Sequence, residues 1–147
     1  MHKVNIEFTY PVDKLLHSFA YFVHGHQRTH LITVYRVHRS GNNSYEWTLL
    51  GKGDPREIQM YNPIFTTNDD VSVKIEPGDW IAVRCAITNK EDKDIQEKTN
   101  EEGEMCLAYL ASFIGNGSKI EPMYCNKYQN DSYSWQTQFG SLPQWVI

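Results

Sequence analysis

Short runs of β-branched and aromatic residues, separated by turn-forming clusters, dominate this chain. Five such runs stand out, at residues 18–26, 31–39, 45–53, 71–88 and 105–113. Glycine, proline, asparagine and aspartate gather between them, and turn signals recur about every ten residues. Helix signals are weak. Short, regularly spaced strands are typical of antiparallel sandwiches, so we expect an all-β fold, an antiparallel jelly-roll β-sandwich.

The length of the chain limits how many domains it can form. Its 147 residues suffice for one domain with a sizeable core, so we expect residues 1–147 to be a single domain. Segment 89–104 interrupts the strand pattern because it is highly charged and has almost no apolar residue. We expect this segment to be a solvated excursion between two strands.

Charge and hydropathy exclude two classes of partner. The net charge of -4 argues against nucleic acid, and no apolar stretch reaches the roughly 20 residues that a membrane-spanning helix needs. The first residues carry no signal peptide, so the chain is either cytosolic or the mature part of a secreted protein. Asn-x-Ser sequons at Asn42, Asn116 and Asn130 lie among turn residues, which slightly favours secretion.

The sequence HGHQRTH, at residues 24–30, is the sharpest local motif. Side chains two residues apart share one face of a strand, so His24 and His26 would present adjacent imidazoles with Gly25 adding no bulk between them. Such a pair suits copper or zinc, although a chance pair on a solvated strand has the same spacing. His30 lies about 13 Å farther along a strand and could share a metal only if the chain turned at residues 27–29.

Met105, in the sequence GEMCLAYL, begins an apolar run after the charged segment. By itself it is most simply a core methionine. Beside the histidine pair it acquires a second meaning, because a thioether is a soft ligand that favours Cu(I) and binds zinc poorly. Closed structural zinc sites prefer four ligands that include thiolates. A set of two histidines and one methionine therefore indicates a copper site that is at times reduced.

Several motifs together resemble one known family. The sequences HSFAYFVHGH, VYRVHRSG, EPGDWIAVRCAIT and GEMCLAYL are similar, in order and spacing, to the C-terminal domain of the copper type II ascorbate-dependent monooxygenases. The similarity extends from about Asn5 to the terminal LPQWVI. It implies a jelly-roll domain that holds one copper ion through His24, His26 and Met105, binds dioxygen there and hydroxylates a C–H bond.

The resemblance also implies partners and cofactors. In this family ascorbate supplies electrons through a second copper, which three histidines of an N-terminal domain hold. No region of the chain resembles that domain. We therefore expect one copper per chain, ascorbate as the reductant of the full enzyme, and an N-terminal copper domain as the partner.

The expected substrate site departs from the family pattern. Members that act on peptidylglycine grip the substrate carboxylate with an arginine two residues before the histidine pair, and that position is Phe22 here. An asparagine two residues after the methionine is Leu107, whereas the tyrosine of the clamp is retained as Tyr109. Each charge-assisted hydrogen bond lost with the arginine is worth about 1.5–3 kcal/mol. We expect a more apolar pocket for a small-molecule or peptide substrate, and a weak grip on a peptide carboxylate.

Three cysteines leave at least one thiol unpaired. The resemblance implies a disulfide between Cys85 and Cys106, and a second bridge to Cys125 whose partner is replaced here by Phe8 or a neighbour. A lost bridge costs about 2–4 kcal/mol unless packing compensates. His17 matches a family position to which we assign a supporting role rather than a ligand role. Disulfides indicate the secretory pathway or the extracellular space.

Three functions remain open from the sequence. The first is the oxygen-binding half of a copper- and ascorbate-dependent monooxygenase related to peptide amidation, with the predicted copper ligands as its catalytic residues. The alternative is a catalytically incomplete copper- or ligand-binding module that lacks the electron-relay domain. The third is a purely structural jelly roll with surface histidines.

Overall fold

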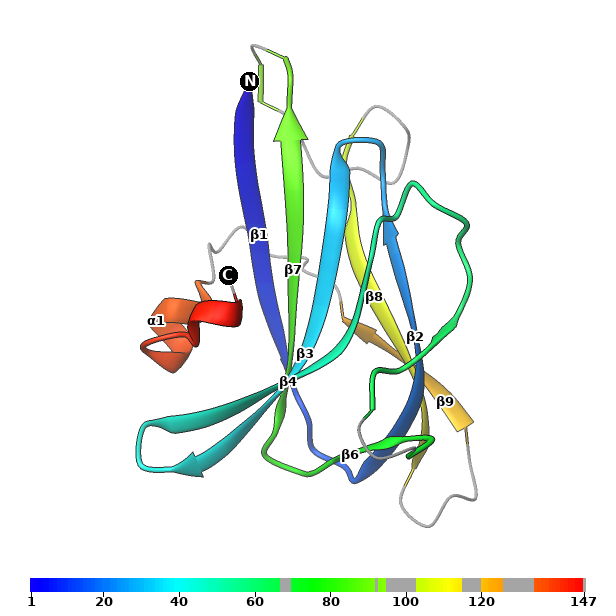
Figure 1. Cartoon of the computed structure of the whole chain (residues 1–147), viewed down its shortest axis with the longest axis vertical. Helices are drawn as coiled ribbons and strands as arrows, with labels where there is room; N and C mark the ends of the chain where they lie inside the picture. Colours follow the sequence, from blue (N-terminus) through cyan, green and yellow to red (C-terminus); the bar gives the residue numbers. More distant parts are fainter. Residues whose placement is uncertain (67–69, 92, 95–102, 115–119, 126–133, 147) are drawn as a thin grey trace.

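The computed structural model describes residues 1–66, 70–91, 93–94, 103–114 and 134–146, together with the backbone of 120–125. Strands dominate the described part of the chain (Figure 1). They are β1 (His2–Pro11), β2 (Leu16–Gly25), β3 (Thr29–Gly41), β4 (Ser44–Gly53), β5 (Asn62–Pro63), β6 (Val73–Ile75), β7 (Trp80–Asn89), β8 (Cys106–Ile114) and β9 (Ile120–Cys125). A helix α1 (Trp135–Phe139) and a 3₁₀ turn η1 (Gln144–Val146) follow.

The strands form two antiparallel sheets. The first sheet has the order β1-β7-β3-β4, and the second has the order β5-β2-β8-β9 with β6 also paired to β2. In the first sheet, β3 and β4 form a hairpin that closes through Asn42 and Asn43. Asn43 adopts a φ of 59°, which asparagine tolerates better than most residues in a tight hairpin turn. Asn42, one of the sequons, is exposed in this turn, whereas Asn116 and Asn130 lie outside the described residues.

The main core lies between the two sheets. Alternate residues of β3 and β7 point inward, and they meet inward-facing residues of β2 and β8. The fully buried members include Ile32, Val34, Ile81, Val83 and Leu110, each at most 1% exposed. Phe8 is 4% exposed in this core. Phe8 or a neighbour was predicted to replace the cysteine that would pair with Cys125. The side chain of Cys125 lies outside the described residues.

The outer face of the first sheet is covered by the C-terminal segment. Trp135 and Phe139 of α1 are buried against Tyr35 and Trp47, which belong to β3 and β4. Figure 1 shows α1 beside β1 and β4, on the side of the first sheet away from the second. This aromatic layer therefore belongs to the first sheet, whereas β2 displays its outward side chains on the outer face of the second sheet.

The sequence prediction of an all-β antiparallel sandwich is confirmed, and the jelly-roll connectivity stays a prediction. Helix α1 was not predicted, because five residues are too few to show a helical period. Most of the charged segment, residues 92 and 95–102, lies outside the described part, so the expected solvated excursion stays a prediction there. At its end the expectation is wrong, because Gly103 and Glu104 are buried. Among the described residues, no helix is long and apolar enough to cross a lipid bilayer.

Candidate metal centre

The outer face of the β2–β8 pair carries the residues that the sequence singled out. The ladder places His24 opposite Leu107 and Phe22 opposite Tyr109. Because side chains two residues apart share a face, all of these project from the same side of the second sheet. Histidine and predicted substrate positions, about 80 residues apart in the chain, are thus brought side by side by strand pairing.

His26 and Met105 adjoin the same face at the end of the ladder. The last pair of the ladder joins Gly25 to Cys106, and His26 and Met105 follow directly on the two strands. Cys106 points into the core, where it is 8% exposed. Alternation continued from Leu107 and Cys106 back to Met105 favours an outward direction for the Met105 side chain.

The two imidazoles are adjacent, and each is held by a hydrogen bond at its Nδ1 atom. The ring centroids of His24 and His26 are 5.6 Å apart, with the rings perpendicular. His24 Nδ1 lies 2.9 Å from Gln59 Oε1, and His26 Nδ1 lies 3.0 Å from the carbonyl oxygen of Gly103. Oxygens of this kind only accept, so both Nδ1 atoms carry the proton. In the neutral form of a ring that donates from Nδ1, the lone pair is on Nε2, which is the atom left for a metal.

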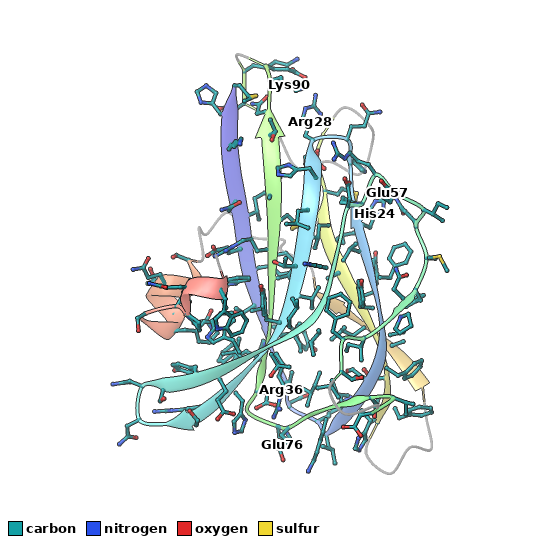
Figure 2. All side chains as sticks on the ribbon, in the orientation of Figure 1. His24, Arg28, Arg36, Glu57, Glu76 and Lys90 are labelled. Atoms are coloured by element: carbon teal, nitrogen blue, oxygen red, sulfur yellow. A yellow bond between two sulfur atoms is a disulfide. The ribbon has the colours of Figure 1, made fainter. Side chains whose placement is uncertain are left out.

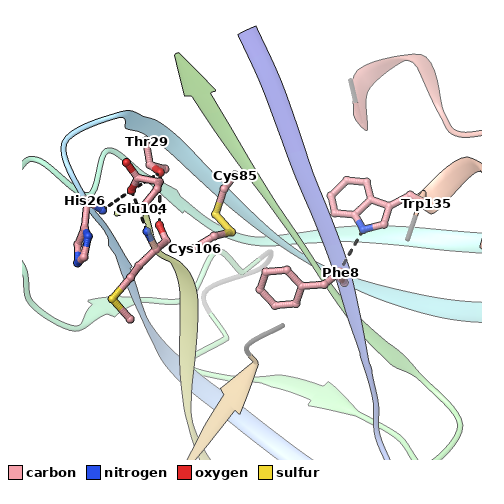
Figure 3. The surroundings of a disulfide bond; sticks show 8 residues. Phe8, His26, Thr29, Cys85, Glu104, Cys106 and Trp135 are labelled. Atoms are coloured by element: carbon pink, nitrogen blue, oxygen red, sulfur yellow. Dashed lines mark hydrogen bonds between the residues drawn. A yellow bond between two sulfur atoms is a disulfide. The ribbon is translucent and has the colours of Figure 1, made fainter. Parts of the chain in front are cut away.

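The buried carboxylate of Glu104 joins the histidine turn to Met105 (Figure 3). Its Oε1 accepts from the N–H of His26 at 2.6 Å, from Thr29 Oγ1 at 2.9 Å and from the N–H of Met105 at 3.1 Å. Its Oε2 accepts from the N–H of Arg28 at 2.9 Å. Glu104 is 5% exposed. These bonds fix the turn that leads from β2 to β3 against the start of β8.

Gly25 is needed because the chain is crowded between the histidines. A Cβ at this position would lie 3.0 Å from the carbonyl oxygen of Met105, 3.0 Å from Thr29 Cβ and 3.2 Å from Pro55 Cγ. The sequence indicated only that Gly25 adds no bulk. The structure adds the reason, which is a close approach of the Met105 backbone.

A hollow of about 340 Å³ opens beside the histidine pair. Its lining residues are His24, Gly25, His26, Gln27, Pro55, Arg56, Glu57 and Gln59. Met105 is absent from this lining as far as the described residues go. A larger hollow of about 510 Å³ lies next to the first, and Gln27 and Arg56 line both. Arg28 and Lys90 also line the larger hollow, but neither His24 nor His26 does.

His30 is separated from the pair despite a turn. The chain does turn after His26, where the N–H of Thr29 donates to the His26 carbonyl at 3.2 Å. The turn carries the chain into β3 of the other sheet, so His30 lies near Thr88 of β7 and lines the larger hollow. His17, at the far end of β2, pairs with Lys74 and Phe113 and does not approach the histidine pair.

Three aromatic rings occupy the face next to His24. The Phe22 ring lies 5.6 Å from that of Tyr109 and 5.4 Å from that of Tyr61, measured between centroids. Leu107 is 9% exposed between this cluster and the histidines. The predicted loss of the arginine therefore leaves an apolar, aromatic surface at the position where a carboxylate clamp would begin.

A second group of possible ligands lies at the opposite end of the sandwich. His38, Glu76 and Asp79 bring their ligand atoms together there, and Figure 2 shows Arg36 and Glu76 far from His24. Arg36 Nε donates to Asp79 Oδ2 at 2.6 Å, and His38 Nδ1 lies 2.6 Å from Asp79 Oδ1. The group is thus an ion-pair network centred on Asp79, and arginine already supplies the positive charge that a metal would bring.

The electrostatics of Asp79 follow from these contacts. Burial acts to raise the pKa of the Asp79 carboxyl. Hydrogen bonds from the Glu76 N–H, His38 and Arg36 outweigh burial and hold this pKa below its ordinary value. The network anchors the turn between β6 and β7.

The disulfide predicted from the resemblance is formed. Cys85 of β7 and Cys106 of β8 are bridged, with Cα atoms 5.9 Å apart (Figure 3). Because β7 and β8 belong to different sheets, this bond ties the two layers together through the core. It also fixes the residue that follows Met105.

The donor atoms fit copper better than zinc. Two neutral imidazoles and a thioether at the edge of a strand pair form a soft, uncharged set with no thiolate. Hydrogen bonds at both Nδ1 atoms orient the rings. Gln59, Gly103 and Glu104 were not predicted. The only signal for Glu104 was its position directly before Met105, and the segment that holds Gln59 gave none.

Comparisons with known proteins identify the family to which the chain is similar. The family model described as "Copper type II ascorbate-dependent monooxygenase, C-terminal domain" matches residues 5–138. Peptidyl-glycine alpha-amidating monooxygenase A of Xenopus laevis is 33% identical over 113 residues, which is 75% of this chain and 11% of that protein. Peptidyl-glycine alpha-amidating monooxygenase B of Xenopus laevis is 34% identical over 77% of this chain and 10% of its own length.

A mammalian relative gives the same match. Peptidylglycine alpha-amidating monooxygenase of Rattus norvegicus is 30% identical over 115 residues, covering 76% of this chain. The chain spans only about a tenth of the length of these curated relatives, 11% for the rat protein.

Proposed function

Since the chain belongs to the copper type II ascorbate-dependent monooxygenases, whose C-terminal domain it matches, we propose that it binds one copper ion through His24, His26 and Met105. The observation that carries this proposal is the pair of Nδ1 hydrogen bonds, to Gln59 and to Gly103, which leave Nε2 of both histidines for a metal. The position of Met105, directly before Cys106 at the end of the β2–β8 ladder, supports the third ligand.

The proposed activity is the oxygen-dependent half of a C–H hydroxylation. Copper held at this site supplies the dioxygen and electron-transfer chemistry of the reaction. The chain itself orients the two imidazoles, presents a thioether that favours the reduced ion, and keeps an aromatic surface next to His24. An N-terminal copper domain of the full enzyme is the proposed partner of this half, and ascorbate would be its reductant.

The proposed substrate is less anionic than a peptide carboxylate. Phe22, Leu107 and Tyr109 line the face where the substrate would lie, and the first two contribute no charge or hydrogen bond. Tyr61 extends the aromatic surface. A small molecule or peptide with an apolar end fits this surface better than a free glycine carboxylate does, because burial of an unpaired carboxylate is costly.

The proposed compartment is the secretory pathway or the extracellular space. The bond between Cys85 and Cys106 needs an oxidising environment to form and persist. An exposed sequon at Asn42 agrees with this location.

Titration with Cu(I) under anaerobic conditions, against a competing chelator, tests the ligand set. We expect one tightly bound ion in the native chain and a loss of tight binding in His24→Ala and Met105→Leu. Matched controls are His2→Ala and Met60→Leu, which alter an exposed histidine and an exposed methionine elsewhere. Unchanged affinity in both site variants would refute the proposed site.

A second candidate is a copper- or ligand-binding module without turnover, which the aromatic ring of Phe22 beside Tyr109 favours. Oxygen uptake with copper, ascorbate and a glycine-extended peptide separates the two candidates. Uptake coupled to hydroxylated product by this chain alone would eliminate the inert module. Tight copper binding without coupled product, even when the full-length protein is used, would favour it.

A further inference from the structure

Glu104 is a buried carboxylate without a cationic partner in the described part of the chain. The ion pairs of that part involve other acids, and Glu104 is instead satisfied by neutral donors. Its two oxygens accept from the N–H groups of His26, Arg28 and Met105 and from the hydroxyl of Thr29. Burying an ionised group costs free energy that neutral hydrogen bonds offset only in part. A cation nearby would therefore stabilise this arrangement further.

The position of Glu104 relates it to the proposed ligands. Oε1 lies 2.6 Å from the backbone nitrogen of His26 and 3.1 Å from that of Met105, so a single oxygen atom bonds the backbones of two ligand residues. The carbonyl of Gly103, directly before Glu104, accepts from the His26 ring. Both carboxylate oxygens are engaged by these donors, which leaves Glu104 as a neighbour of the metal rather than as a ligand.

The charge of the site adds a second argument. Two neutral imidazoles and a thioether bring no negative charge to a bound Cu(I) or Cu(II) ion. Glu104 places one negative charge, fixed and shielded from water, against the backbone of two of these residues. The attraction between a fixed charge and an ion is proportional to the charge of the ion, so it is twice as large for Cu(II) as for Cu(I).

We propose that Glu104 is the positioning residue of the copper site and also balances the charge of the ion. It holds the histidine turn against the start of β8, which sets His26 beside Met105, and its carboxylate favours the oxidised ion over the reduced one. This inference rests on the proposed function, which supplies the copper ligands. It adds the residue that sets the ratio of the affinities for Cu(II) and Cu(I).

Glu104→Gln, which keeps the shape and removes the charge, is the direct test. Affinities for Cu(I) and for Cu(II) are measured separately by chelator competition, and folding is checked by thermal unfolding. Removal of a supporting partner costs roughly 10–100-fold in metal affinity. We expect a loss of this size for Cu(II) and a clearly smaller loss for Cu(I), so that the reduction potential of the site rises.

Thr29→Val is the matched control, since it removes one hydrogen bond to the same carboxylate and leaves its charge. It should weaken both oxidation states by similar factors. Equal losses for Cu(I) and Cu(II) in a folded Glu104→Gln protein, or no loss in either, would overturn the proposal. A role in folding alone would not change the ratio between the two states.

Glu104→Asp keeps the test decisive if Glu104→Gln does not fold. Aspartate retains the charge but is too short to make all the bonds, so both affinities should fall while their ratio stays near that of the native chain. A changed ratio would contradict the proposal. Failure of the ligand set itself is recognised independently, because His24→Ala and Met105→Leu would then bind copper like the native chain.

Discussion

Phe22 stands directly opposite Tyr109 on the β2–β8 ladder, with the two ring centroids 5.6 Å apart. Tyr61 closes on Phe22 from the segment after β4, at 5.4 Å. The position that holds an arginine in the peptidylglycine-hydroxylating pattern is thus occupied by one member of an aromatic cluster. The tyrosine of the clamp remains, but its neighbour here is a ring rather than a guanidinium.

Phe22→Arg should restore recognition of a carboxylate. The guanidinium would lie next to His24 and Tyr109, and a bidentate contact gains about 1.5–3 kcal/mol per charge-assisted bond. We expect a glycine-extended peptide to bind at least about tenfold more tightly than to the native chain, measured by calorimetry. The same peptide with a C-terminal amide is the control. Equal tightening for the amide would contradict a carboxylate contact.

Gly25→Ala should loosen the histidine turn. The added Cβ would meet the Met105 carbonyl oxygen and Thr29 Cβ at 3.0 Å, and both are held by the surrounding bonds. Overpacking of this kind costs about 1–3 kcal/mol. Chemical denaturation measures the loss. Gly41→Ala is the matched control, because its Cβ meets nothing closer than 3.9 Å. Similar losses in both variants would show that the effect is not specific to the site.

Removal of the disulfide should destabilise the sandwich without abolishing its pattern of sheets. The bridge spans a sequence separation of 21 residues, for which the loop-entropy model gives about 3 kcal/mol. We expect this loss in the free energy of unfolding for Cys85→Ala combined with Cys106→Ala. Reductant should lower the stability of the native chain by a similar amount and leave the double variant unchanged. A further loss in the double variant, whose single cysteine is Cys125, would mean that the reductant acts on stability by another route than the Cys85–Cys106 bond.

Asp79→Asn should weaken the dependence of the free energy of unfolding on pH in the acid range. The pKa of Asp79 is lowered in the folded state, so its stabilisation is complete above the ordinary value of about 3.9 and is lost as the pH falls through the folded value. Urea unfolding between about pH 2 and pH 6 compares the two proteins. The variant should be less stable at neutral pH, by about 3 kcal/mol for a broken buried pair. Parallel pH profiles would refute this role.

The strands and the histidine face could be predicted because their signals are local. Alternation along a strand has a period of two, so residues 18–26 alone placed His24 and His26 on one side. The segments that contain the core residues Val34 and Val83 were likewise predicted as strands from their β-branched and aromatic residues. Helix α1 could not be predicted in this way, because its five residues are held by aromatic contacts with β3 and β4 rather than by a helical pattern.

The sequence by itself determined the strand-rich class, the histidine pair and the residue types that favour copper. Tertiary structure alone decided which groups surround them. His26 and Glu104 are 78 residues apart, and His24 and Gln59 are 35 residues apart. Such contacts depend on the register between β2 and β8 and on the path of the chain after β4, which long-range packing sets. No local period encodes that register, so the buried carboxylate and the hydrogen-bonded imidazoles emerge only when β2 has paired with β8 and the segment after β4 has packed beside them.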